Sequence, residues 1–266
     1  MTLLKQVVRW LAERRNRQWI AIGLLVVALL IAVVRFLRFP KGFSDPRNEA
    51  FVEWWTASYQ ERLKLITARR DTCPGAPFVL PADGYIGLLY GDPRPPYSST
   101  HRHQGIDIFS PGDIGETPVY AAYDGYLTRE RSWLSALIIR IPDDPLYAGR
   151  QIWLYYTHMA GPSGEEDTIL DDFPPGTREV FVKQGTLLGY TGNFSGTPFS
   201  PVGVHLHFSV VLDNGQGGYR NELEFDNTVD PSHYLGMAVN YGCAPVVPGC
   251  VLEPICSEAI QGKGGN

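Results

Sequence analysis

A succession of short β-type segments begins near Cys73 and runs through most of the remaining chain. β-Branched and aromatic residues fill each segment, and Gly, Pro, Asp and Asn separate them, which is typical of strands joined by turns. The segments are GIDIFS, PVYAAYDGYLTRER, SALIIRIP, QIWLYYTHM, EVFVKQGTLLGYTG and VHLHFSVVL. With 28 glycines and 21 prolines in 266 residues, the composition disfavours a helical bundle and predicts a mostly β fold.

An apolar run precedes these segments. Trp19 to Val34 contains no charge, and apolar residues beyond Arg35 extend it toward the roughly 20 residues that cross a bilayer. Five basic residues and the single acid Glu13 lie before it, a charge excess that keeps an N-terminus in the cytoplasm. We therefore predict an uncleaved single-pass anchor in the cell membrane, with the rest of the chain outside. A cleaved signal peptide would need a small-residue cleavage site, which the run lacks, and a buried core helix is the remaining alternative.

Apolar residues at helical spacing follow from Pro46 to Arg70, including Phe51, Trp54 and Trp55, with no Gly and no further Pro. This pattern predicts a juxtamembrane helix that packs against the next domain, with contact to the membrane interface as the alternative. The chain then divides into a basic segment with its membrane anchor (1–43), the juxtamembrane helix (44–72), a β domain (73–238) and a cysteine-containing tail (239–266).

Charge is distributed unevenly along the chain. Residues 1–43 hold 8 of the 23 Lys and Arg residues and 1 of the 28 Asp and Glu residues, so the remainder carries 15 − 27 = −12. Phosphate binding requires clustered positive charge. We therefore expect no nucleic-acid partner for the outer part of the chain.

The four cysteines, Cys73, Cys243, Cys250 and Cys256, all fall on the predicted outer side of the membrane. Disulfides form there, so two are expected, with three pairings open. A zinc site made of four thiolates is the alternative, but the spacings lack the closely paired cysteines that such sites use.

Two histidines, His205 and His207, lie two residues apart in VHLHFSVVL. Side chains at i and i+2 share one face of a strand, so both imidazoles project together while Leu206 and Phe208 turn the other way. Burying two polar rings side by side is costly unless each has a partner, and a metal ion would supply one. A solvated sheet face with incidental histidines is the alternative.

Further candidate metal ligands occur in similar apolar settings. His103 lies four residues before Asp107, and His158 ends another strand segment. Catalytic zinc commonly takes three protein ligands of these types plus a water. His101 and His233 complete the six histidines and are predicted bystanders. The sequence contains no HExxH, no GxSxG and no cysteine beside a histidine base, which disfavours other hydrolase classes.

The sequence resembles the lysostaphin/LytM-type zinc endopeptidases in three motifs, which follow one another in the family's order. The family's H-x-G-x-D, Y-x-H-[LM] and H-x-H motifs correspond to His103-Gln-Gly-Ile-Asp107, Tyr156-Thr-His158-Met159 and His205-Leu-His207. Shorter stretches are also similar to family patterns, namely PVYAAYDGYL, VKQGTLLGYTGN and VDPSHYL. The resemblance covers roughly residues 85–235.

This resemblance implies an all-β domain of the duplicated hybrid motif type, whose antiparallel sheets form a metal-binding groove. It implies one Zn²⁺ per chain, held by His103, Asp107 and His207, beside a catalytic pair, His158 and His205. We assign His205 as general base and His158 to stabilising the intermediate or protonating the amine, roles that the sequence does not separate. The implied substrate is the peptide part of bacterial peptidoglycan, at stem or cross-bridge bonds. Family members that lack metal ligands regulate other wall hydrolases, which is the alternative function.

Two segments depart from the family's pattern. The approach to the histidine pair is lengthened to TGNFSGTPFSPVGVHLH, and Gly161 to Arg178 resembles an insertion near His158. The insertion carries five acidic residues and predicts a solvated loop, with cation binding as the alternative. Both segments are expected to reshape the groove and so to influence which bond is cut.

Overall fold

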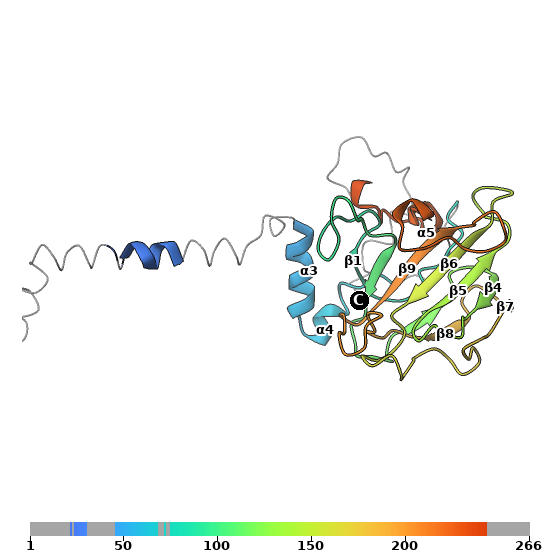
Figure 1. Ribbon diagram of the computed structural model, residues 1–266, viewed down its shortest axis with the longest axis horizontal. Helices are drawn as coiled ribbons and strands as arrows, with labels where there is room; N and C mark the ends of the chain where they lie inside the picture. Colours follow the sequence, from blue (N-terminus) through green and yellow to red (C-terminus); the bar gives the residue numbers. More distant parts are fainter. Residues whose placement is uncertain (1–21, 23, 31–45, 69–71, 73–74, 244–266) are drawn as a thin grey trace, which may run out of the picture. The chain divides into compact units, whose positions relative to one another are not determined.

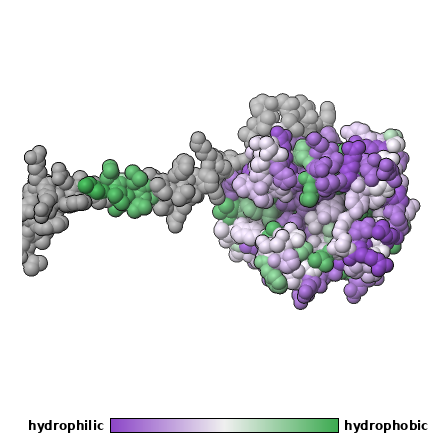
Figure 2. All heavy atoms as spheres, in the orientation of Figure 1, coloured by the Kyte–Doolittle hydropathy of each residue, from purple (hydrophilic) through white to green (hydrophobic). Residues whose placement is uncertain are grey.

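The computed structural model describes residues 22, 24–30, 46–68, 72 and 75–243. The chain separates into two compact units, Met1–Ala50 and Phe51–Asn266. In the first unit, Leu24 to Leu30 are helical and exposed, and they form a hydrophobic stretch in Figure 2. Within the described ranges, every helix falls short of the length or apolarity that a membrane crossing needs. The predicted anchor lies largely outside the described residues and stays a prediction.

Three of the four cysteines, Cys73, Cys250 and Cys256, also lie outside the described residues. The fourth, Cys243, ends a short 3-10 helix, η3 (Tyr241–Cys243). The two disulfides, their pairing and the four-thiolate alternative therefore stay predictions.

Antiparallel strands make up most of the described fold. Their bounds are β1 (Tyr85–Leu88), β2 (Ile106–Phe109), β3 (Pro118–Tyr120), β4 (Gly125–Thr128), β5 (Leu137–Ile141), β6 (Ile152–Thr157), β7 (Val180–Val182), β8 (Leu187–Tyr190), β9 (His205–Leu212) and β10 (Thr228–Val229). The larger sheet has the order β1-β2-β9-β6-β5-β4-β7, with β10 paired to β9, and β3 pairs with β8 in a second sheet (Figure 1). The predicted mostly β, antiparallel class is confirmed, and strands β2 to β9 all lie within the predicted segments.

The single helix predicted from Pro46 to Arg70 is wrong in its extent. The structure has α3 (Pro46–Thr56) and then a separate short helix, α4 (Tyr59–Arg62). Ser58 interrupts them because its backbone is extended, with ψ 157°, and its N–H donates to Glu61 Oε2 at 3.0 Å. A hydrogen bond from the backbone N–H of the capping residue to a glutamate three residues later is one of the two bonds of a capping box, which begins the new helix α4 at this point. The remaining helices described after α4 are short: α5 (Ser232–Leu235), η2 (Phe225–Asn227) and η3.

Strand β9 lies between β2 and β6 and is buried along almost its whole length. Leu206, Phe208 and Val210 belong to the main hydrophobic core. The two-residue period of a strand turns His205 and His207 to the opposite face, as predicted. Both histidines are nevertheless buried, so the solvated-face alternative is wrong and each ring needs polar partners.

The register of the central strands brings the other motif residues beside this histidine pair. Asp107 on β2 pairs with His207 on β9, and Thr157 at the end of β6 pairs with His207 from the other side. Gly105 allows the approach to β2, because a Cβ at this position would lie 2.3 Å from the carbonyl oxygen of Phe208. Three segments far apart in the sequence therefore meet at one place on the sheet.

Candidate metal centre and active site

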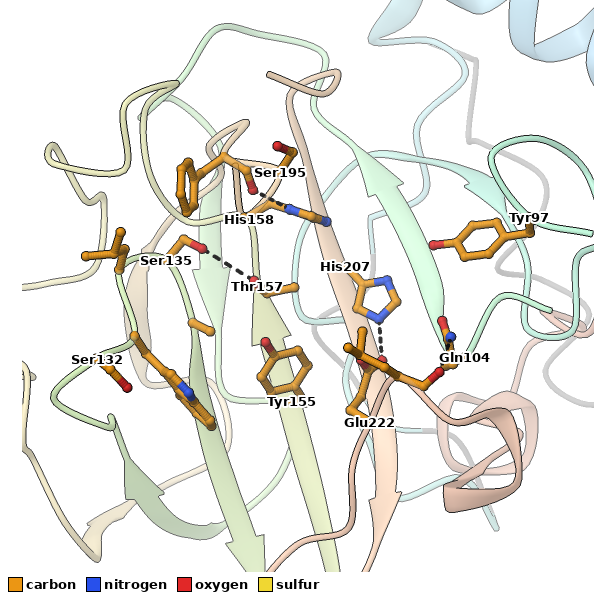
Figure 3. Close-up of a pocket in the computed structure, with 16 residues that line it drawn as sticks. Tyr97, Gln104, Ser132, Ser135, Tyr155, Thr157, His158, Ser195, His207 and Glu222 are labelled. Atoms are coloured by element: carbon orange, nitrogen blue, oxygen red, sulfur yellow. Dashed lines mark hydrogen bonds and ion pairs between the residues drawn. The ribbon is translucent and has the colours of Figure 1, made fainter. Parts of the chain in front are cut away.

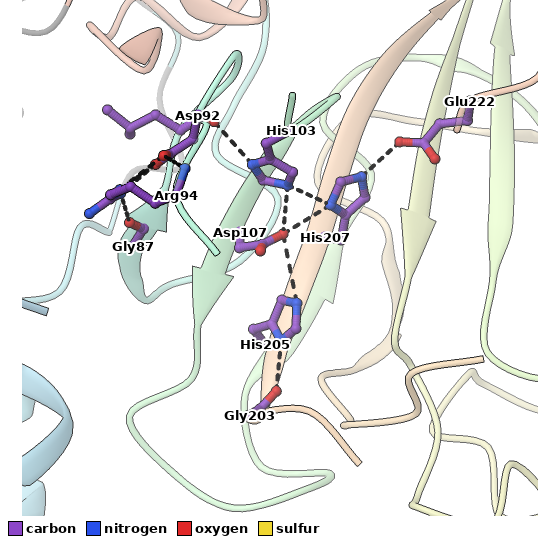
Figure 4. A network of polar contacts seen from close by, with 10 residues as sticks. Gly87, Asp92, Arg94, His103, Asp107, Gly203, His205, His207 and Glu222 are labelled. Carbon is purple, nitrogen blue, oxygen red and sulfur yellow. Dashed lines mark hydrogen bonds and ion pairs between the residues drawn. The ribbon is translucent and has the colours of Figure 1, made fainter. Parts of the chain in front are cut away.

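Three of the predicted side chains place one acceptor atom each at a common point (Figure 4). His103 Nε2 lies 3.0 Å from His207 Nδ1 and 3.1 Å from Asp107 Oδ1, and His207 Nδ1 lies 2.9 Å from the same oxygen. All three residues are buried. The backbone fixes His103 at both sides, because its N–H donates to the Asp92 carbonyl and its own carbonyl accepts from the Gly91 N–H.

The outward-facing ring nitrogens show which atoms carry hydrogen. His103 Nδ1 lies 3.0 Å from the Leu89 carbonyl oxygen, and His207 Nε2 lies 2.8 Å from Glu222 Oε1. A carbonyl and a carboxylate only accept, so both outward nitrogens donate. In neutral rings each of the two inward nitrogens then carries a lone pair instead of a hydrogen. These lone pairs face each other and the Asp107 carboxylate. Such a group of acceptors requires a cation at its centre.

The pKa values of these groups point to the same need for positive charge. Burial raises the pKa of Asp107, but electrostatic interaction with the His103 and His205 rings and the hydrogen bonds to His103 and His207 hold it well below its ordinary value. Burial lowers the pKa of His207, yet the charge of Glu222 and the hydrogen bond to Asp107 raise it to about 10. Without another cation the site therefore holds a proton on His207, which a metal ion would displace.

The donor set fits zinc. Two imidazole nitrogens and one carboxylate oxygen are zinc ligands, and three protein ligands leave one position open. Bonds of about 2.0 Å in a tetrahedron separate donor atoms by about 3.3 Å, close to the 2.9 to 3.1 Å observed between these atoms. Rings and carboxylate therefore need only small adjustments to hold the ion.

The second predicted pair, His158 and His205, lies beside this group. Their ring centroids are 4.4 Å apart, and His205 Nε2 is 3.7 Å from Asp107 Oδ1. Each ring donates from Nδ1 to a backbone carbonyl at 2.6 Å, His158 to Phe194 and His205 to Gly203. In both rings Nε2 is therefore the free acceptor, and on His205 it is turned toward Asp107.

Both rings of this pair are neutral near pH 7. Burial lowers the pKa of His158 to about 3, and electrostatic interaction with the neighbouring His205 and His207 rings adds to this shift. Burial also lowers the pKa of His205, although the charge of Asp107 opposes the shift. Two neutral imidazoles with free Nε2 atoms beside a cation site are able to accept protons from a reacting group.

The lengthened segment before β9 supplies both carbonyls that orient this pair. Phe194 and Gly203 belong to the stretch TGNFSGTPFSPVGV. Gly192, near its start, packs so closely on the turn after β6 that a Cβ would lie 2.5 Å from the His158 carbonyl oxygen. That turn also holds His158 at φ 71°, a left-handed conformation that is uncommon outside glycine. This segment thus orients the histidine pair.

A cavity of about 490 Å³ opens beside the histidines (Figure 3). His158 and His207 line it, together with the aromatic residues Tyr97, Trp133, Tyr155 and Phe194 and the polar residues Gln104, Ser132, Ser135, Thr157 and Ser195. Glu222 is the one Asp, Glu, Lys or Arg among its lining residues. The cavity offers apolar ring faces and neutral hydrogen-bonding groups to a ligand.

Other predicted features supply no ligand to the metal group. His101 and His233 are exposed and contribute nothing to the metal group, as expected. The acidic residues of the segment 161–178 are mostly exposed, and Asp167 pairs with Arg129 at 2.8 Å. None of these residues lines the cavity. The segment 161–178 therefore acts on the groove only through residues that do line it, for example where Gly164 packs against Phe194.

Sequence reasoning missed Glu222. It lies in the loop between β9 and η2, and its side chain is only 12% exposed. Burial raises the pKa of Glu222, but the charge of His207 and the hydrogen bond to that ring hold it below its ordinary value, so the group is ionised. A carboxylate that accepts from the outer nitrogen of a metal-binding histidine fixes its tautomer and makes it a stronger ligand. The sequence around Glu222 carries no signal of this role.

Substituting Glu222→Ala is expected to weaken zinc binding by about ten- to a hundredfold, because His207 loses the acceptor that orients it. Competition with a colorimetric chelator measures the affinity. Glu224→Ala is the matched control, since Glu224 is exposed in the same loop and should leave the affinity unchanged. Equal affinities for the two variants would show that Glu222 does not support the metal group.

Comparisons with known proteins give structural neighbours only. No family model and no curated protein matches the chain. Lysostaphin from Staphylococcus simulans is similar at a TM-score of 0.38 and 21% identity over 62% of this chain and 56% of its own. A zinc-containing peptidase from Vibrio cholerae is similar at a TM-score of 0.31 and 19% identity, over 61% of this chain and 40% of its own. A mutant catalytic domain of the prophage-encoded protein EnpA from Enterococcus faecalis is similar at a TM-score of 0.29 and 21% identity, over 59% of this chain and 97% of its own. The chain thus spans about half the length of lysostaphin.

Proposed function

We propose that this protein is a membrane-anchored zinc metalloendopeptidase that cleaves peptide bonds in bacterial peptidoglycan. The convergence of three acceptor atoms at 2.9 to 3.1 Å, beside two neutral histidines, carries the proposal. The three sequence motifs that resemble lysostaphin/LytM-type endopeptidases support it, because the same residues supply every atom of this arrangement. A regulator that has lost its metal ligands would not need all five side chains.

His103, Asp107 and His207 would hold the zinc ion. When bound, zinc polarises a peptide carbonyl and lowers the pKa of a coordinated water to about 7. The outward hydrogen bonds to the Leu89 carbonyl and to Glu222 keep both imidazoles in the tautomer that such binding requires.

His205 and His158 would move the protons. His205 accepts a proton from the attacking water at Nε2, and the nearby Asp107 carboxylate stabilises the imidazolium that results. His158 lines the cavity directly. There its Nε2 contacts the reacting peptide, either to stabilise charge on the carbonyl oxygen or, once protonated, to protonate the leaving amine.

The predicted anchor would place this site on the outer side of the cell membrane, where peptidoglycan lies. The charge distribution of residues 1–43 and the exposed apolar helix Leu24 to Leu30 support an anchor. Full-length protein that stays in the membrane after carbonate extraction, with its outer domain sensitive to added protease, is expected. A shortened protein free in the medium would instead indicate a cleaved signal peptide.

Product analysis tests the proposed activity. The full chain is incubated with purified peptidoglycan, and new free amino groups and new reducing sugar ends are counted separately. A peptidase releases amino groups alone, and a chelator stops the release. If the chain releases nothing by itself but accelerates a second wall hydrolase, the regulatory alternative replaces the proposal.

A further inference from the structure

An aromatic cluster joins the C-terminal part of α3 to the sheet. Trp54 is fully buried, and its ring stacks on Tyr85 of β1 at 5.2 Å. The Phe51 ring lies 4.8 Å from Phe109 of β2, and that of Trp55 lies 6.0 Å from Phe109, nearly perpendicular to it. From Phe51 onward the helix thus belongs to the same compact unit as the metal group.

Phe109 connects this cluster to His205. The two residues are paired across β2 and β9, and their rings stack at 4.8 Å with an angle of 24° between their planes. The stacked ring fixes the plane of the imidazole. Since Trp55 contacts the same phenyl ring, it limits the movement of Phe109 away from His205.

Trp55 also packs against the second support of His205. A Cβ at Gly203 would lie 2.5 Å from Cη2 of Trp55, so the indole covers this glycine closely. The Gly203 carbonyl accepts the Nδ1–H of His205 at 2.6 Å. Trp55 therefore contacts both groups that orient the imidazole, although it lies 150 residues earlier in the chain.

We propose that Trp55 is a positioning residue for His205, acting through Phe109 and through the Gly203 carbonyl. The inference rests on the proposed function, in which His205 moves the proton. Removing the indole takes away one of the rings around Phe109, which Phe51 still contacts, and uncovers the backbone at Gly203. Both supports of His205 then gain freedom to move. A misplacement of about 1 Å at such a group costs on the order of a hundredfold in rate.

The test compares Trp55→Ala with Val52→Ala in the full chain purified in detergent. Val52 lies on the same helix with an exposed side chain, so Val52→Ala is expected to behave as the parent. Trp55→Ala is expected to lower kcat for peptide cleavage by about ten- to a hundredfold, with KM and zinc affinity unchanged. Trp55→Phe, which keeps a flat ring, should recover part of the rate. Trp55→Leu replaces Trp55→Ala if the alanine variant does not fold.

A second readout does not depend on activity. With ¹⁵N-labelled histidine, NMR detects the hydrogen-bonded Nδ1–H of His205, which is assigned by its loss in His205→Ala. Trp55→Ala should broaden or abolish this signal and leave the His103 signal in place. An unchanged His205 signal with an unchanged kcat overturns the inference. If the parent protein itself cleaves nothing, the proposed function fails, and the NMR comparison alone decides whether Trp55 positions His205.

Discussion

Asp107→Ala is expected to abolish stoichiometric zinc binding. Asp107 supplies the anionic atom of the group, and its Oδ1 lies within 3.1 Å of the inward nitrogens of both His103 and His207. Without it, two neutral imidazoles remain, and the compensation of charge that stabilises a divalent cation in a buried site is lost. The fall in affinity should exceed the ten- to hundredfold expected for an outer partner such as Glu222.

Metal analysis after gel filtration measures this result. Asp226→Ala is the control, because Asp226 is an exposed aspartate in η2 that lies outside the metal group. The parent and the control should each retain one zinc per chain, and Asp107→Ala close to none. An Asp107→Ala variant that binds one zinc as tightly as the parent would place the metal elsewhere in the chain.

His205→Ala is expected to separate catalysis from metal binding. The ring contributes no atom to the three-ligand group, and Nδ1 is occupied by the Gly203 carbonyl. Loss of a proton-transfer residue costs about a hundred- to ten-thousandfold in kcat, while zinc affinity should change little. Initial rates of amino-group release at saturating peptidoglycan measure the effect.

The control for this prediction is His233→Ala, since His233 is exposed and lies outside both the metal group and the cavity lining. Its rate and zinc content should equal those of the parent. A His205→Ala variant that cleaves as fast as the parent would remove His205 from the mechanism, and the comparison with His158→Ala would then identify the residue that moves the proton.

The part of the site that was predictable from sequence follows from local periodicity. The alternation along β9 predicts that His205 and His207 share a face while Leu206 and Phe208 enter the core, and the structure has this arrangement. The motif containing His103 and Asp107 is also local, since four residues separate them. The strand segments were predictable for the same reason, because turn residues mark their ends.

The remaining features depend on contacts between distant segments or on backbone atoms. The carbonyls of Phe194 and Gly203 orient two histidines, but a carbonyl leaves no signature in the residue type. Glu222 reaches the site from a loop whose sequence carries no motif. The aromatic spacing around Trp55 predicted that its helix packs against the β domain, which is confirmed, but not that the indole contacts Gly203. The helix break at Ser58 is a local competition that apolar spacing does not reveal, because the spacing of hydrophobic residues continues across it.

The most direct test of the account is a zinc titration of the metal-free full chain, with the release of free amino groups from purified peptidoglycan followed at each addition. The account predicts no release without zinc, then a linear rise in rate that ends at one zinc per chain. Equal rates in metal-free and zinc-loaded protein, or a fully loaded protein that releases no amino groups, would contradict the assignment of this chain as a zinc endopeptidase.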